Sequence, residues 1–186
     1  MADTVLTRTQ AEDAIYSAVC ACLGLDESSA PAQRRVRRAW PSAEEQGAQP
    51  GFARTENVCF LRVSPADEPY SAFAETQSAY DAAADALRQT QSRCDALSVL
   101  LVFYGPAAFD DARRTRDGLA SEEIRRVLRR KNLYPVRPPA APRRVPELSG
   151  GRWWERCDLT LTLYERTERQ YTAGYIAQAD VTSKGD

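Results

Sequence analysis

The pattern of hydrophobic and polar residues first predicts a helix near the N-terminus. Over residues 10–24, apolar side chains recur at the spacing of one helical face, at Ile15, Ala18, Val19, Cys22 and Leu23. Thr9 is placed to cap the start of this helix, and Gly24 is placed to end it. We therefore expect an N-terminal helix with one face against a core.

Strand character follows on both sides of a predicted loop. Residues 34–40 contain Arg34, Arg35, Arg37 and Arg38, and we interpret them as an edge strand whose charges discourage edge-to-edge pairing. Contact with nucleic acid is the alternative interpretation of these arginines. Residues 41–53 are rich in Pro, Gly and Gln and are predicted to form a mobile loop. Residues 57–63 are typical of a strand, which Pro65 stops.

The central feature is an apolar run that ends in a turn and a helix. Residues 97–104 are β-branched, aromatic and leucine-rich, which predicts a buried strand. Gly105 allows a tight turn, and Pro106 suits the first turn of a helix that runs to about residue 117 and breaks at Gly118. A second helix is predicted from Ser121.

That second helix has two distinct faces. Ile124, Val127 and Leu128 are expected to point inward, and the outward residues are Arg125, Arg126, Arg129 and Arg130. Acidic residues in its first turn and basic residues in its last turn match the helix dipole. The arginines are thus accounted for without any ligand.

Residues 66–94 allow two interpretations. The alanine-rich stretch 82–88 has high helix propensity. Residues 87–91 instead alternate and lead directly into the strand at 97–104, as in a long hairpin. The pattern alone leaves helix and hairpin both open.

The C-terminal part is predicted to be extended. Residues 134–151 contain five prolines and are expected to form a semi-rigid arm. Residues 159–164 alternate leucine with Thr or Tyr, as in a strand with one buried face. A turn at residues 172–174, a final antiparallel strand over 175–181 and a flexible tail over 183–186 complete the chain. The expected fold is a single α+β domain over 1–186, a mostly antiparallel sheet packed by the N-terminal helix and two mid-chain helices.

Charge changes this picture locally rather than overall. The net charge of the 186 residues is −1, so overall charge does not point to nucleic acid. Residues 112–144, however, hold eleven Arg or Lys and three acidic residues, a local charge of +8. Opposed surface patches that steer a partner, or simply a solvated helix face and a polar loop, would both account for this asymmetry.

The sequence gives little indication of a catalytic or metal-binding site. The chain has no histidine, which excludes Ser-His and Cys-His dyads and His-containing zinc sites. Its five cysteines lack a Cys-x-x-Cys pair and are expected to be reduced and buried, as in cytoplasmic proteins. No catalytic, cofactor or metal residue is predicted, and the chain is not expected to be an enzyme. No apolar stretch approaches the roughly 18 residues of a membrane span.

The most distinctive short segment is residues 153–158, which begins Trp153-Trp154-Glu155-Arg156. A tandem Trp beside an acid and an Arg could stack on a sugar or a base. The interpretation we favour is packing or an interface, in which one Trp anchors the proline-rich segment to the sheet while Glu155 and Arg156 pair nearby.

Three specific segments follow one another along the chain, namely Tyr104-Gly105-Pro106, Val145-Pro146-Glu147-Leu148 and Trp154-Glu155-Arg156-Cys157-Asp158-Leu159. With these segments as its most specific part, the chain resembles the neck terminator family of tailed bacteriophages, related in role to tail terminator and tail completion proteins. The resemblance covers roughly residues 10–182. It also favours sheet over helix at residues 66–94.

The resemblance implies a structural virion protein, assembled in the bacterial host cytoplasm and located at the head-tail junction. Such proteins form a ring, usually six-fold, that ends the tail tube and joins it to the head connector, with DNA passing through the lumen. The implied partners are the chain itself, a head-connector or adaptor protein, the tail-tube protein and a sheath protein. Alternatives are another tube, connector or baseplate adaptor protein, or a small sequence-independent nucleic-acid binder.

Candidate interface residues follow from these interpretations. The proline-rich arm and the loop at 41–53 look suited to reach a neighbour, and the expected contacts or anchors are Arg143, Arg144, Trp153, Trp154 and Arg156. If passing DNA is contacted by Arg34, Arg35, Arg37 and Arg38, the contacts would be with phosphates and independent of base sequence.

Overall fold

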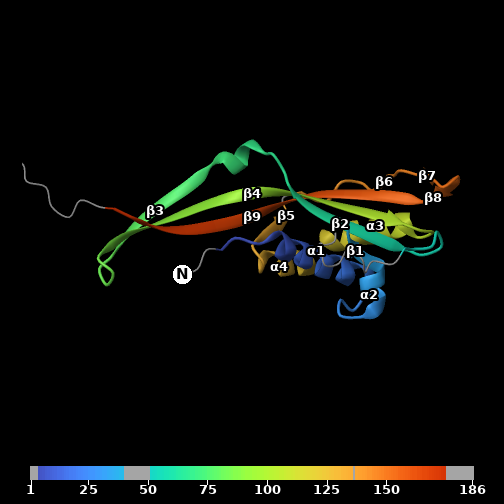
Figure 1. Cartoon of the computed structure of the whole chain (residues 1–186), viewed down its shortest axis with the longest axis horizontal. Coiled ribbons are helices and arrows are strands. Elements are labelled where there is room, and N and C mark those ends of the chain that lie inside the picture. Colours follow the sequence, from blue (N-terminus) through green and yellow to red (C-terminus); the bar gives the residue numbers. More distant parts are fainter. Residues whose placement is uncertain (1–3, 40–50, 136, 175–186) are drawn as a thin grey trace, which may run out of the picture.

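The computed structural model of the chain describes residues 4–39, 51–135 and 137–174. Helices lie on one side of a mostly antiparallel sheet, which confirms the predicted α+β class (Figure 1). The helices are α1 (Arg8–Leu23), α2 (Ala30–Arg35), α3 (Ala108–Leu119) and α4 (Glu122–Arg129), with a short 3-10 turn η1 (Pro69–Ala72). The strands are β1 (Val36–Arg38), β2 (Val58–Pro65), β3 (Ala74–Asp81), β4 (Ala86–Tyr104), β5 (Leu133–Pro135), β6 (Arg143–Arg144), β7 (Glu147–Ser149), β8 (Arg152–Trp154) and β9 (Arg156–Ala173).

The sheet is organised around the two long strands β4 and β9. Its order is β1-β2-β4-β9-β5, with β3 paired to β4 and β6 paired to β9. Only the β1–β2 pair is parallel among the described strands. The β4–β9 ladder runs without interruption from Leu87 opposite Ala173 to Tyr104 opposite Arg156.

Alternation along these strands gives the sheet two different faces. One face, here the helix-covered face, carries Leu61, Val99 and Leu161, which are buried against the helices. The other, the helix-free face, carries side chains such as Phe60 and Val102, which are only partly buried. The hydrophobic core thus lies on one side of the sheet, and the other side is left for other contacts.

The N-terminal cap of helix α1 lies two residues earlier than predicted. The hydroxyl of Thr7, not of Thr9, accepts the backbone N–H of Gln10, and the Gln10 side chain accepts the N–H of Thr7 in return. Gly24 ends the helix in the left-handed conformation, as expected (φ 69°). Ile15 and Val19 on its inner face are fully buried.

The predicted joint between the central strand and the next helix is present at Gly105. Its φ is +106°, and a Cβ there would lie 2.3 Å from the carbonyl oxygen of Glu56. The side chain of Asn57 accepts the N–H of Ala107 at 2.8 Å, immediately before α3. Only glycine fits this turn, because any side chain would meet the backbone of the neighbouring segment.

Two details of the following helices were predicted wrongly. Gly118 does not end α3 but lies inside it, where a Cβ would come within 2.5 Å of the Cys22 sulfur, so the glycine lets α1 and α3 approach closely. Val127 was expected to point inward and is 41% exposed, because Ile124 and Leu128 already fill the inner face of the short α4.

The arginine-rich stretch is only partly an edge strand. Ser29 caps a helix through the N–H of Ala32, and α2 then includes Arg34 and Arg35 in its last turn. The strand itself is limited to Val36–Arg38, at the edge of the sheet beside β2. The prediction of strand over residues 34–35 was wrong because a local cap and helix dipole favour the helix there, and Trp40 lies outside the described residues.

Within residues 66–94, the long hairpin interpretation is confirmed: β3 and β4 form it from Ala74 onward, after the short 3-10 turn η1. A tight turn at residues 82–85 joins β3 to β4, and Asp81 accepts the N–H groups of Ala83 and Ala84. The high helix propensity of the alanine-rich stretch does not decide the structure here. The alternating segment continues the central strand β4, and it is stabilised as a strand by pairing with both β3 and β9.

The turn predicted at residues 172–174 is also wrong in part. Thr172 and Ala173 continue β9 and pair with Arg88 and Leu87. The predicted final strand over 175–181 and the tail over 183–186 lie outside the described residues. So do residues 41–50 of the predicted mobile loop, whereas 51–53 are described.

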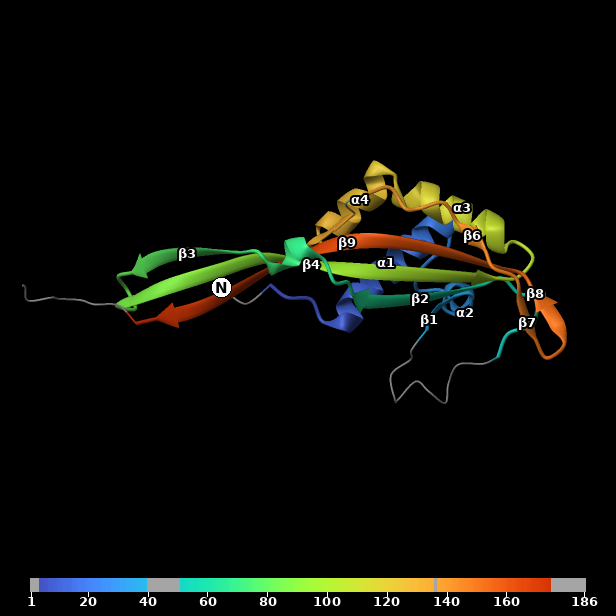
Figure 2. The same cartoon turned by 90° about the horizontal axis from the view of Figure 1, so that it is seen from above.

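The result is a body with a projecting arm. We call residues 74–96 and 166–173 the distal arm, which is built from β3 and the far halves of β4 and β9. The arm extends beyond the helices on the left of Figure 1, and the turned view shows the same projection (Figure 2).

Two further observations concern the described residues. All five cysteines are free thiols, and Cys20, Cys59 and Cys157 are buried. Of the helices in the described ranges, none combines the length and the apolar character that crossing a bilayer would require.

Candidate interface at the hairpin end of the sheet

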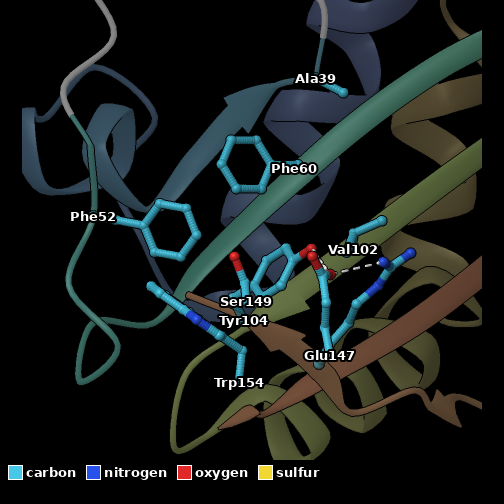
Figure 3. A pocket seen from close by; sticks show the side chains of 9 residues that line it. Ala39, Phe52, Phe60, Val102, Tyr104, Glu147, Ser149 and Trp154 are labelled. Atoms are coloured by element: carbon cyan, nitrogen blue, oxygen red, sulfur yellow. Dashed lines mark hydrogen bonds and ion pairs between the residues drawn. The ribbon is translucent and has the colours of Figure 1, made fainter. Parts of the chain in front are cut away.

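A shallow pocket opens on the helix-free face, where β4 ends and β9 begins (Figure 3). Its volume is about 410 Å³. The strands β2, β4 and β9 supply its floor, the β7–β8 hairpin supplies one wall, and the segment before β2 supplies Phe52. The main lining residues are Phe52, Phe60, Tyr104, Glu147, Trp154 and Arg156.

Aromatic rings hold these elements together. The ring of Phe52 lies 5.3 Å from Trp154 and 5.5 Å from both Phe60 and Tyr104, measured between centroids. Tyr104 and Trp154 meet edge to face at 6.4 Å. Such tilted and edge-to-face contacts are the preferred geometries of aromatic pairs, so the cluster fixes the hairpin on the sheet.

A polar network surrounds the Tyr104 hydroxyl. This hydroxyl donates to Glu147 Oε2 at 2.8 Å, and Arg156 Nη1 donates to the same oxygen at 3.0 Å. The other nitrogens of Arg156 bind both oxygens of Asp158, at 2.8 and 2.9 Å. The guanidinium of Arg156 also lies 5.9 Å from the Tyr104 ring centroid. Arg156 therefore ties β9, β7 and β4 together.

The pKa values in this network follow from its contacts. Burial, and then the hydrogen bond to Glu147, raise the pKa of Tyr104 to about 12. Hydrogen bonds from Tyr104 and Arg156 lower the pKa of Glu147. Hydrogen bonds to Asp158 raise the pKa of Arg156, against the opposing effect of burial. Near neutral pH the network thus holds a neutral phenol, a carboxylate and a guanidinium.

The β7–β8 hairpin presents different residues on its two sides. Gly150 and Gly151 form its two-residue turn with φ of +56° and +71°, which is the type I′ pattern. Trp154, opposite Glu147, faces the pocket. Leu148 and Trp153, which also oppose each other, are 59% and 62% exposed. We call Leu148 and Trp153 the outer pair.

The remaining predicted interface residues lie beside this hairpin. Arg143 and Arg144 form β6, opposite Asp158 and Cys157 of β9, and both side chains are exposed. Arg144 binds Glu155 at 3.0 Å. Of the five residues predicted as contacts or anchors, the structure brings Trp154 and Arg156 into the pocket and leaves the other three at the surface around it.

The four arginines considered for DNA phosphate do not form one exposed row. Arg35 binds Asp111 at 2.6 Å, and Arg38 binds Asp13 and Glu12. The Arg37 side chain donates to the carbonyl oxygen of Arg34 at 2.7 Å and is only 8% exposed. Arg34 itself is exposed. Contact between these arginines and DNA phosphate stays a prediction. Because Arg37 is buried, we do not expect it to take part in such contact.

Three residues that line this pocket were not predicted as site residues from the sequence. Phe52 was placed in a mobile loop, Tyr104 was considered only for the turn that follows it, and Glu147 only as part of a motif. The three come from segments far apart in the chain, and no pattern in the sequence reports that they meet. The tandem Trp was the available signal, because a large aromatic side chain after a proline-rich segment needs a partner to pack on.

A family model described as phage neck terminator protein matches residues 10–186. The chain belongs to the phage neck terminator family. No curated protein matches the chain. Family membership gives the protein a structural role at the neck of a bacteriophage particle, in contact with head and tail proteins.

In this neck terminator, the segments that carry the family resemblance converge on the pocket. Tyr104 ends β4, Glu147 lies in the Val145–Leu148 segment, and Arg156 begins β9. The hydrogen bonds of Glu147 to Tyr104 and Arg156 join all three segments. Motifs that are separate in the sequence therefore form a single site in the neck terminator, at the end of the sheet farthest from the distal arm (Figure 2).

Proposed function

We propose that this neck terminator forms a closed ring, six-fold in symmetry, that ends the tail tube and joins it to the head connector, with DNA passing through the lumen. The observation that carries the proposal is the family match across residues 10–186. The sheath protein is a further neighbour in a tail that has one. The ring is part of the virion and assembles in the host cytoplasm.

The hairpin end of the sheet supports a contact between neighbours. Trp154 and Arg156 fix the hairpin on its inner side, so the outer pair Leu148 and Trp153 is presented by a firmly held element. A preorganised apolar surface loses little conformational freedom on binding. Large aromatic side chains and arginines are also frequent anchors of interfaces, and Arg143 and Arg144 lie close by in β6.

The charge distribution supports a head-to-tail arrangement. The outer surfaces of α3 and α4, together with the residue that caps the end of α4, carry exposed arginines, namely Arg113, Arg114, Arg125, Arg126, Arg129 and Arg130. In a cyclic ring each copy uses two different surfaces, so patches of opposite charge on different faces can meet. The basic helical surface would then face an acidic surface of a neighbouring subunit or ring.

Native mass spectrometry of the purified protein tests the ring. The concentration series is measured alone and with the tail-tube protein as a template. A closed oligomer, most simply a hexamer, is the expected result. A protein that stays strictly monomeric under both conditions would contradict ring formation and shift weight to the second candidate.

The second candidate is sequence-independent contact with nucleic acid. The exposed arginines of α3 and α4 favour it, because Lys and Arg that neutralise phosphates bind any sequence and release counterions. Binding of duplex DNA by the purified protein, measured at several salt concentrations, separates the two. Tight binding that weakens steeply with salt supports this candidate, whereas weak binding beside a stable ring leaves only transient contact with passing DNA.

A further inference from the structure

Negative charge gathers in the segment that runs from the end of β2 to the tip of the arm. Residues 67–85 contain five acidic residues and no Lys or Arg. Asp81 is compensated, because it binds Arg88 at 2.7 Å. Asp67 and Glu75 are exposed, and the described part of the chain gives them no basic partner. These two carboxylates are therefore available to positive charge on another molecule.

Exposed aromatic rings accompany these carboxylates. Tyr70 is 59% exposed and Phe73 is 72% exposed, and their ring centroids lie 6.2 Å apart. Tyr70 also lies 6.1 Å from the ring of Tyr164, which alternates with the buried Leu163 along β9 and so faces the helix-free side. Arg137 lies near Tyr164, but the carboxylates outnumber it there. We call this surface the acidic aromatic patch, and its residues are Asp67, Glu68, Tyr70, Phe73 and Glu75.

The outer surface of α4 has the opposite character. It carries exposed arginines beside an exposed apolar residue, Val127. Arg129 binds Glu122, whereas the other arginines have no acidic partner among the described residues. This surface therefore offers positive charge and an apolar contact to a neighbour. We call it, together with the cap residue after the helix, the basic α4 surface, and its residues are Arg125, Arg126, Val127, Arg129 and Arg130.

The two surfaces lie on different sides of the molecule at a similar level. In Figure 1, η1 and β3 rise above the sheet, and α4 lies below it with the other helices. Both surfaces are close to the place where the arm joins the body, as the turned view also shows (Figure 2). Rotation about an axis along the molecule keeps this level. It can therefore bring one surface of a copy onto the other surface of the next copy.

The chemistry of the two surfaces is complementary. A guanidinium pairs with carboxylates and also stacks on aromatic rings, and the acidic aromatic patch offers both partners. Arginine and aromatic residues are enriched at protein interfaces. DNA phosphate could bind the basic α4 surface but would be repelled by the acidic aromatic patch, so DNA accounts for only one of the two surfaces. A second copy of the chain accounts for both.

We propose that the acidic aromatic patch of one copy docks on the basic α4 surface of its neighbour in the ring. The proposal rests on the proposed ring and adds the two surfaces that join neighbouring copies. In this contact the α4 arginines pair with Asp67 and Glu75, and Val127 packs against the rings of Tyr70 and Phe73. Because each copy carries one surface of each kind, the contact repeats from copy to copy until the ring closes.

Charge reversal on either surface tests the docking. The patch variant carries Asp67→Arg and Glu75→Arg, and the α4 variant carries Arg126→Glu and Arg130→Glu. Each variant alone places like charges opposite each other at the contact, so the concentration for half-maximal ring formation should rise at least about tenfold. Urea unfolding of each variant shows that the monomer is still folded, because the replaced side chains are exposed.

Mixing the two variants provides the matched control. In an equimolar mixture, the reversed patch of the first variant meets the reversed α4 surface of the second. The two unchanged surfaces also meet, so every contact in an alternating ring is again complementary. We expect rings to return to within about threefold of the wild-type concentration. Native mass spectrometry should find equal numbers of the two variants in each ring, because their masses differ.

Cysteine cross-linking provides a second measurement that does not depend on charge. The background is Cys22→Ser with Cys94→Ser, which removes the two partly exposed thiols. In it, Phe73→Cys combined with Val127→Cys should give disulfide-linked ladders up to the ring size under oxidation. The control combines Phe73→Cys with Phe109→Cys. Phe109 is also exposed, but it lies near the start of α3 at the hairpin end of the sheet and should not cross-link.

The outcomes separate this inference from the proposed ring. A wild-type chain that forms no oligomer overturns the ring and the docking together. Reversal variants that form rings like the wild type overturn the docking and leave the ring standing. If the α4 variant then loses binding to duplex DNA, the basic α4 surface serves DNA instead.

Two further results would also overturn the docking. Weakened rings that do not recover on mixing would mean that the two surfaces do not meet each other. Cross-linked dimers from Val127→Cys alone would indicate a two-fold contact between α4 helices. Recovery on mixing, together with ladders from the Phe73→Cys and Val127→Cys pair, supports the inference.

Discussion

At the scale of single residues, Gly105 is the glycine, among those that the structure describes, where a side chain fits least well. It has a positive φ and faces the Glu56 carbonyl, and it links the buried β4 to α3. Gly151 has a similar positive φ of +71°, but a Cβ there has nothing within 4 Å. Substitutions at Gly151 therefore report the free-energy cost of the positive φ alone, whereas substitutions at Gly105 add the cost of a steric clash.

Gly105→Val should destabilise the protein much more than Gly151→Val. We expect a loss of about 3 kcal/mol or more at position 105 and about 1–2 kcal/mol at position 151, since only the first adds a clash to the strained φ. The free energy of unfolding in urea is the measurement. Equal losses would show that the close approach at Gly105 can relax.

The Glu147 carboxylate should contribute a pH-dependent part of the stability. Its pKa lies below the usual 4.5 because Tyr104 and Arg156 donate hydrogen bonds to it. A carboxyl group with a lowered folded pKa stabilises the fold above its unfolded pKa and loses that contribution as pH falls through the folded pKa. The difference in unfolding free energy between the wild type and Glu147→Gln should therefore be constant near neutral pH and shrink below pH 4.5.

Comparison with Glu147→Gln isolates this effect from other carboxyl groups. Burial raises the pKa of Glu165, so that residue acts in the opposite direction on acidification. Because Glu165 is present in both proteins, its contribution cancels in the difference. A difference that does not change with pH would mean that Glu147 contributes only as a hydrogen-bond acceptor.

At the scale of elements, the two tryptophans of the β7–β8 hairpin should have different roles, one in the stability of the monomer and the other in ring assembly. Trp154→Ala removes the ring that packs on Phe52 and Tyr104, and we expect a loss of about 2 kcal/mol of stability because the side chain is partly buried. Trp153→Ala should leave monomer stability within about 0.5 kcal/mol and weaken ring formation. Urea unfolding and native mass spectrometry give the two readouts. Weakened rings only in Trp154→Ala would place the contact elsewhere.

Elements with local signals could be predicted from the sequence, and those set by distant contacts could not. The body half of β4, the joint at Gly105 and the start of α4 at Ser121 were predicted, because apolar runs, glycine and capping residues act over a few residues. The hairpin at residues 66–94 stayed open, since alanine propensity and alternation disagreed. Phe52 was assigned to a loop because its partner Trp154 lies far along the chain.

The candidate site was predictable to a similar degree. The tandem Trp and Arg156 were singled out, but the sequence could not tell which Trp faces inward, because that depends on the register of a hairpin closed by two glycines. The arginines of residues 34–38 looked alike in sequence. Their surroundings differ because a helix ends and a strand begins between Arg35 and Val36.

At the scale of the whole molecule, assembly should depend on charge at the hairpin end. Arg143 and Arg144 are exposed, and a surface pair such as Arg144–Glu155 contributes at most about 1 kcal/mol to stability. Arg143→Glu with Arg144→Glu should therefore keep the monomer folded and reduce ring formation, and high salt should narrow the difference from the wild type. Native mass spectrometry at two salt concentrations measures this.

Replacement of both residues by lysine is the control for charge. Arg143→Lys with Arg144→Lys should assemble nearly as the wild type does, if the contribution is electrostatic. Unchanged assembly in the glutamate variant would mean that β6 does not contact a neighbour.

The unbroken β4–β9 ladder gives the protein a mechanical property. One half of the ladder lies in the exposed arm, and the other half, which includes Leu161 and Leu163, is packed under the helices. The hydrogen bonds cross between the strands at right angles, so tension along the arm loads many of them in shear at once. A pull at the tip is therefore borne by the packed core and not by a hinge, and the arm can transmit force from one end of the molecule to the other.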